Sequence, residues 1–254
     1  MDCMSLLGFS ACTPDLELRE SLPFPVFDID KTAMPAMLRR RSSSAMQLAF
    51  SAATAACAHA QRSPSMLPSI FASVAGEIQT TDLLCTELVK PDGVISPSAF
   101  HNSVQNTAAG YWCIAQHCMQ SASALAAGAD TFAMALLEAW CQLSCQGGEL
   151  LVVCYDEQWP DYLDSARGKP AFACALVLAA GIVENSLLQI GRPQLGQATF
   201  PVEFAALANA MPILSSIPLL RFATIGGAAQ NIAVCSNQFF SGTNLGGFAV
   251  ICRS

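Results

Sequence analysis

Short apolar runs alternate with stretches of helical periodicity along the first 180 residues of the chain. Five runs of apolar or small residues predict strands: Ser5–Ala11, Ser69–Val74, Gln120–Leu125, Glu149–Tyr155 and Ala171–Ala180. Four longer segments have the periodicity of helices: Ser44–Ala60, Ile78–Leu88, Ser98–Gln116 and Thr131–Ser144. The run Glu149–Tyr155 has the continuous apolar character of a strand in a parallel sheet. Strands that alternate with helices predict a layered α/β fold.

The most informative local pattern is a strand, a tight turn and a helix. The predicted strand Gln120–Leu125 leads into the small-residue turn Ala127–Asp130, and a helix follows directly. Enzymes use this nucleophile-elbow layout to expose one side chain at a helix N-terminus, where the helix dipole and free N–H groups stabilise negative charge. The exposed positions here are Gly128, Ala129 and Asp130, and none is Cys or Ser. The pattern predicts the backbone of a catalytic site without its nucleophile, with Asp130 as the helix N-cap.

Charge is scarce in this chain. Asp, Glu, Lys and Arg make up 12% of the residues, against about 25% in an average soluble domain, and hydrophobic residues make up 53%. This composition excludes a disordered chain, and the net charge of −7 argues against a nucleic-acid partner. A folded monomer of this length exposes roughly 10,800 Å². The 12 basic and 19 acidic side chains cannot cover that area, which predicts an apolar interface.

The sequence favours neither a membrane protein nor a metalloprotein. The best apolar run, Ala171–Val183, is shorter than the about 20 residues of a transmembrane helix. Met1–Cys12 lacks the basic region of a signal peptide, so we expect a cytoplasmic protein whose cysteines are mostly small core residues. Cys141 and Cys145 are one helical turn apart, but no second Cys/His pair with zinc spacing accompanies them. We expect no metal ion and no cofactor.

Several segments, in order and spacing across Ser5–Ala180, carry a resemblance to a known superfamily. They are Met37–Ser43, Ser69–Thr81, Ser96–Gly110, Ala126–Ala139 and Leu151–Glu157. Together they resemble the thiolase superfamily and, within it, the ketosynthase-like chain length factors of aryl polyene biosynthesis in Gram-negative bacteria. The resemblance implies a truncated thiolase-like α/β fold with α-β-α layers. It also implies one domain over residues 1–254, in which residues 1–180 are similar to the N-terminal ketosynthase half and residues 181–254 are a divergent, abbreviated second half.

The departures from a catalytic ketosynthase decide what the resemblance implies for function. A ketosynthase has a Cys at the elbow and two His residues in its second half, whereas the nucleophile position falls here at about Ala129. The only histidines, His59, His101 and His117, all precede the elbow. The resemblance therefore implies a chain that is not itself an enzyme. It implies a heterodimer with an active β-ketoacyl-acyl carrier protein synthase, which this chain stabilises and whose polyene cavity it shapes.

The resemblance also suggests roles for individual residues. The acyl tunnel is expected to be lined by Ala75, Ile78, Tyr111 and Trp112. The dimer interface is expected along the strand before the elbow and the helix beside it, at Ser103, Asn106, Gly110, Gln120, Ser121, Ser123 and Leu125. Core packing is an equal alternative for the two aromatic residues. Arg39, Arg40 and Arg41 are candidates for contact with an acidic acyl carrier protein, although pairing with local carboxylates is the simpler interpretation.

Two other functions stay open at this point. The first is a short thiolase-like acyltransferase with a nucleophilic Cys outside the elbow, for which Cys113 or Cys118 with His117 is a conceivable pair. A buried Cys beside a His that satisfies a backbone carbonyl is the simpler interpretation of that segment. The second is a homodimeric acyl-binding module. The elbow favours the non-catalytic partner, because a transferase should have Cys or Ser there.

Overall fold

The structure is a computed structural model that describes residues 1–163, 171–195, 200–234 and 248–253. A mixed sheet runs through it in the order β3-β2-β4-β5-β1-β6-β9-β7, with β8 paired to β9. Strand β2 is parallel to β3 and β4, and the other pairs are antiparallel. The strands are β1 (Cys3–Cys12), β2 (Ser69–Ala72), β3 (Ala122–Leu125), β4 (Glu149–Asp156), β5 (Phe172–Ala180), β6 (Leu188–Gly191), β7 (Gln194–Leu195), β8 (Gln230–Ala233) and β9 (Phe248–Arg253).

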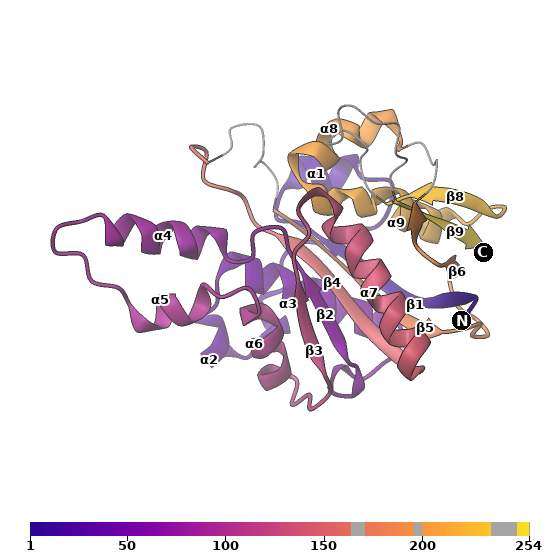
Figure 1. Cartoon of the computed structure of the whole chain (residues 1–254), viewed down its shortest axis with the longest axis horizontal. Coiled ribbons are helices and arrows are strands. Elements are labelled where there is room, and N and C mark those ends of the chain that lie inside the picture. Colours follow the sequence, from indigo (N-terminus) through magenta and orange to yellow (C-terminus); the bar gives the residue numbers. More distant parts are fainter. Residues whose placement is uncertain (164–170, 196–199, 235–247, 254) are drawn as a thin grey trace.

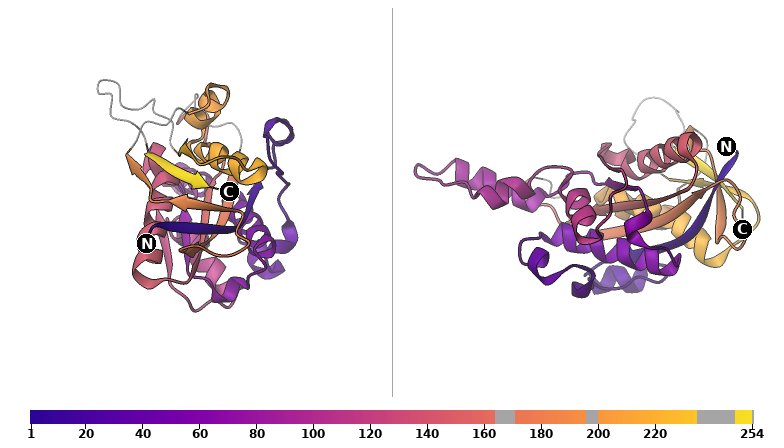
Figure 2. Two further views of the ribbon diagram at one scale, coloured as in Figure 1. Left: turned by 90° about the vertical axis from the view of Figure 1, so that its right-hand side faces the viewer. Right: turned by 90° about the horizontal axis from the view of Figure 1, so that it is seen from below.

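Helices cover both faces of the sheet (Figures 1 and 2). The α-helices are α1 (Leu16–Ser21), α2 (Ala36–Arg39), α3 (Ser44–His59), α4 (Ile78–Leu88), α5 (Pro97–Asn102), α6 (Thr107–Ala115), α7 (Thr131–Gln146), α8 (Val202–Ala210) and α9 (Ile217–Ile225). The short 3-10 turns are η1 (Lys31–Ala33), η2 (Pro64–Met66), η3 (Gly128–Asp130) and η4 (Pro212–Ser216). Among the described residues, none of the helices combines the length and the apolar character needed to span a bilayer.

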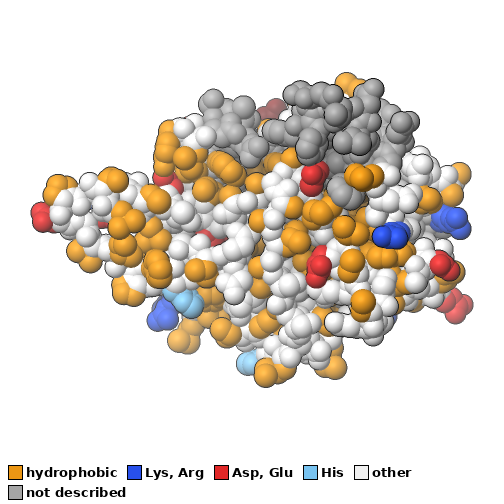
Figure 3. Space-filling view, viewed as in Figure 1, with side chains coloured by type: hydrophobic (Ala, Val, Ile, Leu, Met, Phe, Trp, Pro, Cys, Tyr) orange, Lys and Arg blue, Asp and Glu red, His pale blue; other side chains and the backbone are white. Residues whose placement is uncertain are grey.

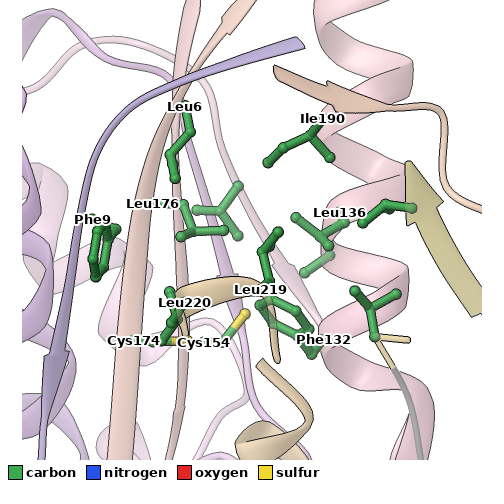
Figure 4. Close-up of a cluster of buried hydrophobic side chains, with 14 of the residues drawn as sticks. Leu6, Phe9, Phe132, Leu136, Cys154, Cys174, Leu176, Ile190, Leu219 and Leu220 are labelled. Atoms are coloured by element: carbon green, nitrogen blue, oxygen red, sulfur yellow. The ribbon is translucent and has the colours of Figure 1, made fainter. Parts of the chain in front are cut away.

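Side chains along the central strands point alternately to the two faces of the sheet, which divides the interior into two cores. Leu150, Val152 and Cys154 of β4 face α7, η4 and α9, and Figure 4 shows this core with Phe132 and Leu136 of α7. The intervening residues of β4, Leu151, Val153 and Tyr155, pack under α3 and α6. Because successive strand side chains point to opposite faces, a strand apolar at every position is covered on both sides. The result is three layers, α-β-α, as the resemblance implies.

Helix α3 lies close against β1 because its residues are small. The Ser43 hydroxyl caps its first turn by accepting from the Met46 N–H at 3.0 Å. Half of its buried side chains are alanine, which lets the helix approach the sheet. A Cβ at Gly8 of β1 would lie 2.5 Å from the Ala60 nitrogen, so this contact requires glycine.

Helices α4 and α5 form a hairpin that projects from the body beside the sheet (Figures 1 and 2). We call residues 78–102 the arm. Helix α4 buries only Leu84, and α5 buries only Asn102. The two helices pack mainly on each other. The arm is therefore anchored at its base and has little contact with the rest of the described chain.

Most predicted elements are confirmed, and the helix Ile78–Leu88 has the predicted bounds. The single helix predicted over Ser98–Gln116 is wrong, because the chain forms two helices, α5 and α6, with a break at residues 103–106. The Ser103 hydroxyl donates to the Phe100 carbonyl at 2.9 Å, where α5 ends. The parallel character expected for Glu149–Tyr155 holds only on one side, since β4 is parallel to β2 and antiparallel to β5.

Candidate functional site

The elbow has the predicted backbone. Strand β3 leads through Ala127 to Gly128, whose φ of 57° is left-handed, and η3 passes directly into α7. The Thr131 hydroxyl closes the turn, because it donates to the Gly128 carbonyl at 2.8 Å and accepts from the Ala127 N–H at 3.0 Å. A Cβ built on Gly128 would meet nothing within 4 Å. The turn is thus open at that position, and only its left-handed φ disfavours a side chain there.

The elbow offers no nucleophile, and its capping differs in part from the prediction. Asp130 occupies the N-cap position of α7, but its side chain makes no capping hydrogen bond. The predicted N-cap position of Asp130 is thus confirmed, but Thr131 supplies the hydroxyl that satisfies the turn. Gly128 is exposed, and Ala129 and Asp130 are half-buried. The helix N-terminus could stabilise negative charge, but neither Gly128 nor Ala129 has a group that could attack an acyl carbon.

The four cysteines with the largest upward pKa shifts are poor nucleophiles. Burial raises the pKa of the Cys12, Cys57 and Cys252 thiols to about 12. A hydrogen bond with Cys174, together with burial, raises the pKa of Cys154 well above its usual value. Acyl transfer needs a thiolate, whose formation a raised pKa opposes. These four thiols are therefore core residues.

The sequence interpretation of His117 and Cys118 is partly wrong. His117 is exposed and has a φ of 51°, so it is not a buried residue that satisfies a carbonyl. The buried Cys118 thiol is the group that contacts a carbonyl, that of Leu67, at 3.5 Å. Cys141 and Cys145 of α7 are both exposed. Within the described residues, no three His, Cys, Asp or Glu side chains come together as metal ligands.

Three buried carboxyl groups meet at the base of the arm. Glu77, directly before α4, is 1% exposed, and Asp156 and Glu157 at the end of β4 are each 2% exposed. The Ser73 hydroxyl donates to Asp156 Oδ1 at 2.6 Å, and the Val74 N–H donates to the same oxygen at 3.0 Å. These bonds tie the loop after β2 to the end of β4.

Glu157 and Glu77 are held differently. Glu157 accepts from the Gln79 N–H at 3.1 Å and from the Ser44 hydroxyl. Both carboxyl oxygens of Glu77 are buried without a hydrogen-bond partner within the described chain. Glu157 therefore links the first turn of α4 to the start of α3, whereas Glu77 lies unpartnered beside it.

Burial controls the protonation of this cluster. It raises the pKa of Asp156 to about 7, although the Ser73 hydroxyl opposes the rise. Burial also raises the pKa of Glu77 to about 7, and the negative charge of Glu157 adds to the rise. The pKa of Glu157 is raised by burial as well. The sequence reasoning missed this cluster; two adjacent acidic residues after an unbroken apolar strand were the available signal.

The predicted interface residues lie along one open edge of the sheet. Among the described strands, β3 pairs only with β2, so its other side is free of a strand partner in that part of the chain. The Ser69 N–H donates to the Ser121 carbonyl and the Ser73 N–H donates to the Leu125 carbonyl, each at 3.0 Å. Because the backbone N–H and C=O groups of successive strand residues point to opposite sides, those of Ala122 and Ala124 point to the free edge.

The side chains around this edge are exposed to different degrees. Asn106, Gly110, Gln120 and Ser121 are exposed, and Ser103, Ser123 and Leu125 are half-buried. A Cβ at Gly110 of α6 would meet nothing within 4 Å. The neighbouring Ile114 is 64% exposed and Met119 is 93% exposed. An unpaired edge flanked by exposed apolar side chains is suited to contact with another chain.

The four predicted tunnel residues have different environments. Trp112 is fully buried, with its ring 5.1 Å from that of Phe50 and 6.1 Å from that of Phe71. The half-buried Tyr111 donates its hydroxyl proton to Asn102 Oδ1 at 3.0 Å. Ala75 and Ile78 are half-buried at the base of the arm. Trp112 is thus a core residue of this chain, while the other three keep some exposed surface.

The three arginines at the end of α2 and directly after it have no acidic partner among the described residues. Arg40 and Arg41 are exposed, and Arg39 is half-buried with its guanidinium donating to the Lys31 carbonyl. The described ion pairs involve Arg19, Arg62, Lys90 and Arg221. The expected pairing with local carboxylates is therefore wrong. We call Lys31, Arg39, Arg40 and Arg41 the basic patch; none of the four forms an ion pair among the described residues.

Comparison with known proteins supports the fold. The family described as Beta-ketoacyl synthase, N-terminal domain, matches residues 17–209. A chain of the ketosynthase (ApeO) in complex with its chain length factor (ApeC) from Xenorhabdus doucetiae has a TM-score of 0.70 and 20% identity, over 99% of this chain and 99% of that chain. No curated protein sequence matches.

Two further solved structures are longer than this chain. The ishigamide ketosynthase/chain length factor has a TM-score of 0.57 and 16% identity, over 74% of this chain and 65% of that chain. The second is the complex AntDE:AntF, a type II PKS acyl-carrier protein in complex with its ketosynthase bound to the hexaketide. It has a TM-score of 0.58 and 12% identity, over 74% of this chain and 68% of that chain. These likenesses confirm the truncated thiolase-like fold. Because the family match spans most of its length, the chain belongs to the family of β-ketoacyl synthase N-terminal domains.

Proposed function

We propose that this chain is a non-catalytic chain length factor of the cytoplasm. In this proposal it forms a heterodimer with an active β-ketoacyl-acyl carrier protein synthase, stabilises that enzyme and forms one wall of the cavity in which an aryl polyene chain grows. The observation that carries the proposal is the elbow: a ketosynthase-type strand–turn–helix with Gly128, Ala129 and Asp130 where a nucleophile is required.

The size of the chain also supports the proposal. The matched chain of the ApeO–ApeC complex is covered to 99%, so it is about as long as this one. The matched chains of the other two complexes are covered to 65% and 68%. A shortened ketosynthase fold therefore occurs in a complex that contains a ketosynthase and a chain length factor. The free edge of β3 offers the surface for such a partner, because strand pairing extends a sheet between chains.

The alternative, an acyltransferase with a Cys outside the elbow, has weaker support. It needs a thiol whose pKa is lowered by a neighbouring base or helix N-terminus. The resolved shifts are upward for Cys3, Cys12, Cys57, Cys113, Cys154 and Cys252. Among the described residues, no hydrogen bond joins Cys113 to the exposed His117.

Acyl uptake by the separate subunits tests the proposal. The chain is expressed alone and together with a ketosynthase encoded beside it, and each sample receives an acyl-loaded carrier protein. Intact-protein mass spectrometry should then find the acyl adduct on the ketosynthase subunit only, within a complex of the two chains. An acyl adduct on this chain would support the transferase instead. A ketosynthase that is equally soluble and active without this chain would contradict the partner role.

The basic patch is the proposed contact for the acyl carrier protein. The family resemblance implies an acidic acyl carrier protein. Arginines that form no ion pair attract such a partner and speed its association. The triple change Arg39→Gln, Arg40→Gln and Arg41→Gln should raise the KM of the complex for acyl carrier protein several-fold and reduce its dependence on salt. Arg221→Gln, far along the sequence and paired with Glu203, is the control. An unchanged KM in the triple variant would assign the patch a solvated, structural role.

A further inference from the structure

We propose that a pocket at the end of the sheet formed by β1, β6 and β9 binds a small organic phosphate. This inference is independent of the proposed heterodimer. The pocket has a volume of about 420 Å³, and residues at the start of β1 and along β6 and β9 line it. Pockets for small molecules have volumes of about 300–1,000 Å³, so the size suits such a ligand. It lies at the end of the molecule where Figure 1 marks the N-terminus beside β6 and β9.

The register of the strands builds the floor of the pocket. Cys3 of β1 pairs with Gly191 of β6. A Cβ built on Gly191 would lie 3.4 Å from the Cβ of Ile251 in β9, so the three residues form one row across the sheet. Directly opposite residues of paired strands point to the same face. Because glycine has no side chain, the row is open in its middle, between Cys3 and Ile251.

The pocket opens on the face of the sheet opposite to the core under α7. The residues that alternate with this row are fully buried in that core: Met4, Ile190 and Cys252. Successive strand side chains point to opposite faces, so the row itself points away from the core. Ile251 is accordingly 38% exposed. The core therefore fixes the strands in place, while within the described residues their other face stays open to a ligand.

Two arginines without a described ion-pair partner line the pocket. Arg253 of β9 pairs with Gln189 of β6 and shares the face of the row, and Arg192 follows β6 directly. Both arginines are exposed, and among the described residues neither side chain forms an ion pair or a hydrogen bond. The chain has only 12 basic side chains, and Figure 3 shows how sparse they are on the face in view. Two such guanidinium groups at one hollow are suited to hold an anion.

The charges around the pocket are positive on balance. Asp2 is the acidic residue of the lining, against Arg192 and Arg253. Burial, and then the charge of Asp2, raise the pKa of the Cys3 thiol, whereas the charge of Arg253 opposes the rise. Both charges therefore act on the floor of the pocket. An anion bound there would add a partner for the arginines that Asp2 does not supply.

The donors and the apolar floor together favour an organic phosphate over a carboxylate. Each guanidinium is a planar fork of N–H donors, and the side-chain amides of Gln189 and Gln194 add further donors. A phosphate monoester offers one more acceptor oxygen than a carboxylate and has a charge of about −1.5 to −2 at pH 7. Cys3, Ile182 and Ile251 offer apolar surface to the organic group of the ligand. Inorganic phosphate would leave that surface uncovered.

Binding of phenyl phosphate to the full chain tests the inference. The double variant Arg192→Gln, Arg253→Gln should weaken this binding at least tenfold in titration calorimetry at low salt, because both guanidinium groups are lost. Its melting temperature should stay unchanged, since both side chains are exposed. The matched control is Arg40→Gln with Arg41→Gln, which removes two other exposed arginines and should bind like the wild type. An equal loss in the control, or no binding by the wild type, would overturn the inference.

Alkylation of Cys3 locates the bound ligand. The rates of reaction with N-ethylmaleimide at Cys3 and at the exposed Cys85 are measured at pH 8 by peptide mass spectrometry. Phenyl phosphate should slow the reaction of Cys3 several-fold, because the ligand covers its thiol, and should leave that of Cys85 unchanged. An unchanged rate at Cys3 under saturating phenyl phosphate would place the ligand elsewhere and overturn the proposed site. Inorganic phosphate that binds as tightly as phenyl phosphate would overturn the assignment of an organic ligand.

Discussion

At the scale of single residues, the carboxyl cluster at the base of the arm makes the stability of the chain depend on pH. Glu77 and Asp156 have folded-state pKa values of about 7, against ordinary values of 4.5 and 3.8. A raised folded-state pKa means that the folded chain holds protons more tightly than the unfolded chain. The stability from this effect is complete below about pH 4, and it is lost as the pH rises through about 7.

The substitution Glu77→Gln should flatten this dependence. Because Gln does not ionise, the free energy of unfolding of the variant should fall less between pH 5 and pH 8 than that of the wild type, by roughly 2–4 kcal/mol. Urea denaturation at both pH values measures it. The exposed Glu20→Gln is the matched control and should follow the wild type. Parallel curves for the wild type and Glu77→Gln would show that Glu77 is already ionised in the folded chain.

Two of the expected tunnel residues should respond in different ways to a smaller side chain. Trp112 is fully buried between α3 and the sheet, so Trp112→Leu should lower the melting temperature of the chain by several degrees. Ile78 is half-buried at the start of α4. If it lines the cavity of the complex, Ile78→Ala should lengthen the products with a smaller loss of stability, as measured by mass spectrometry of the acyl chains. Product length that stays fixed would make Ile78 a packing residue.

At the scale of elements, the free edge of β3 can be altered without breaking the sheet. The N–H of Ala124 points away from β2, so proline there removes a donor that the isolated chain does not use in the ladder. Ala124→Pro should therefore keep the chain folded and abolish co-elution with the ketosynthase in size-exclusion chromatography. Ala124→Gly keeps the N–H and should still bind. Co-elution of the proline variant would place the partner elsewhere.

The elements that could be predicted from sequence are those with a strong local pattern. Unbroken apolar runs identified β4 and β5, and the small-residue turn identified the elbow around Gly128. The break between α5 and α6 could not be predicted, because Ser103–Asn106 is neither apolar nor rich in Gly or Pro. The carboxyl cluster was also missed, since it forms only when the ends of β2 and β4 meet. Exposure of the arm depends on the absence of a covering element, which no local pattern encodes.

At the scale of the whole molecule, the last third of the chain completes the sheet and one of its cores. Strand β6 pairs with the outer edge of β1, and Ile213, Leu214 and Ile217 are fully buried in the core under α7. We propose on this basis that residues 1–254 form one domain. Residues 181–254 then serve mainly as a cover for the half that resembles a ketosynthase.

A chain that ends at Ala180 should accordingly fail to fold cooperatively. It would expose the free edge of β1 and the apolar face against which η4 and α9 pack. Differential scanning calorimetry should show one transition for the whole chain and none for the shortened one. A shortened chain with an unchanged melting temperature would show that residues 181–254 are a separate unit.

The pairing of β1 with β5 also sets an order of events during synthesis. Cys12 pairs with Ala173, so β1 can pair with β5 only after about 160 further residues have been translated. At ribosomal speed this takes about 8–32 s. For that time β1 is an apolar strand without its central neighbour. Contacts so distant in sequence also slow the folding step itself. A nascent chain of this protein therefore has a long interval in which binding by chaperones, or by the proposed ketosynthase partner, competes with aggregation.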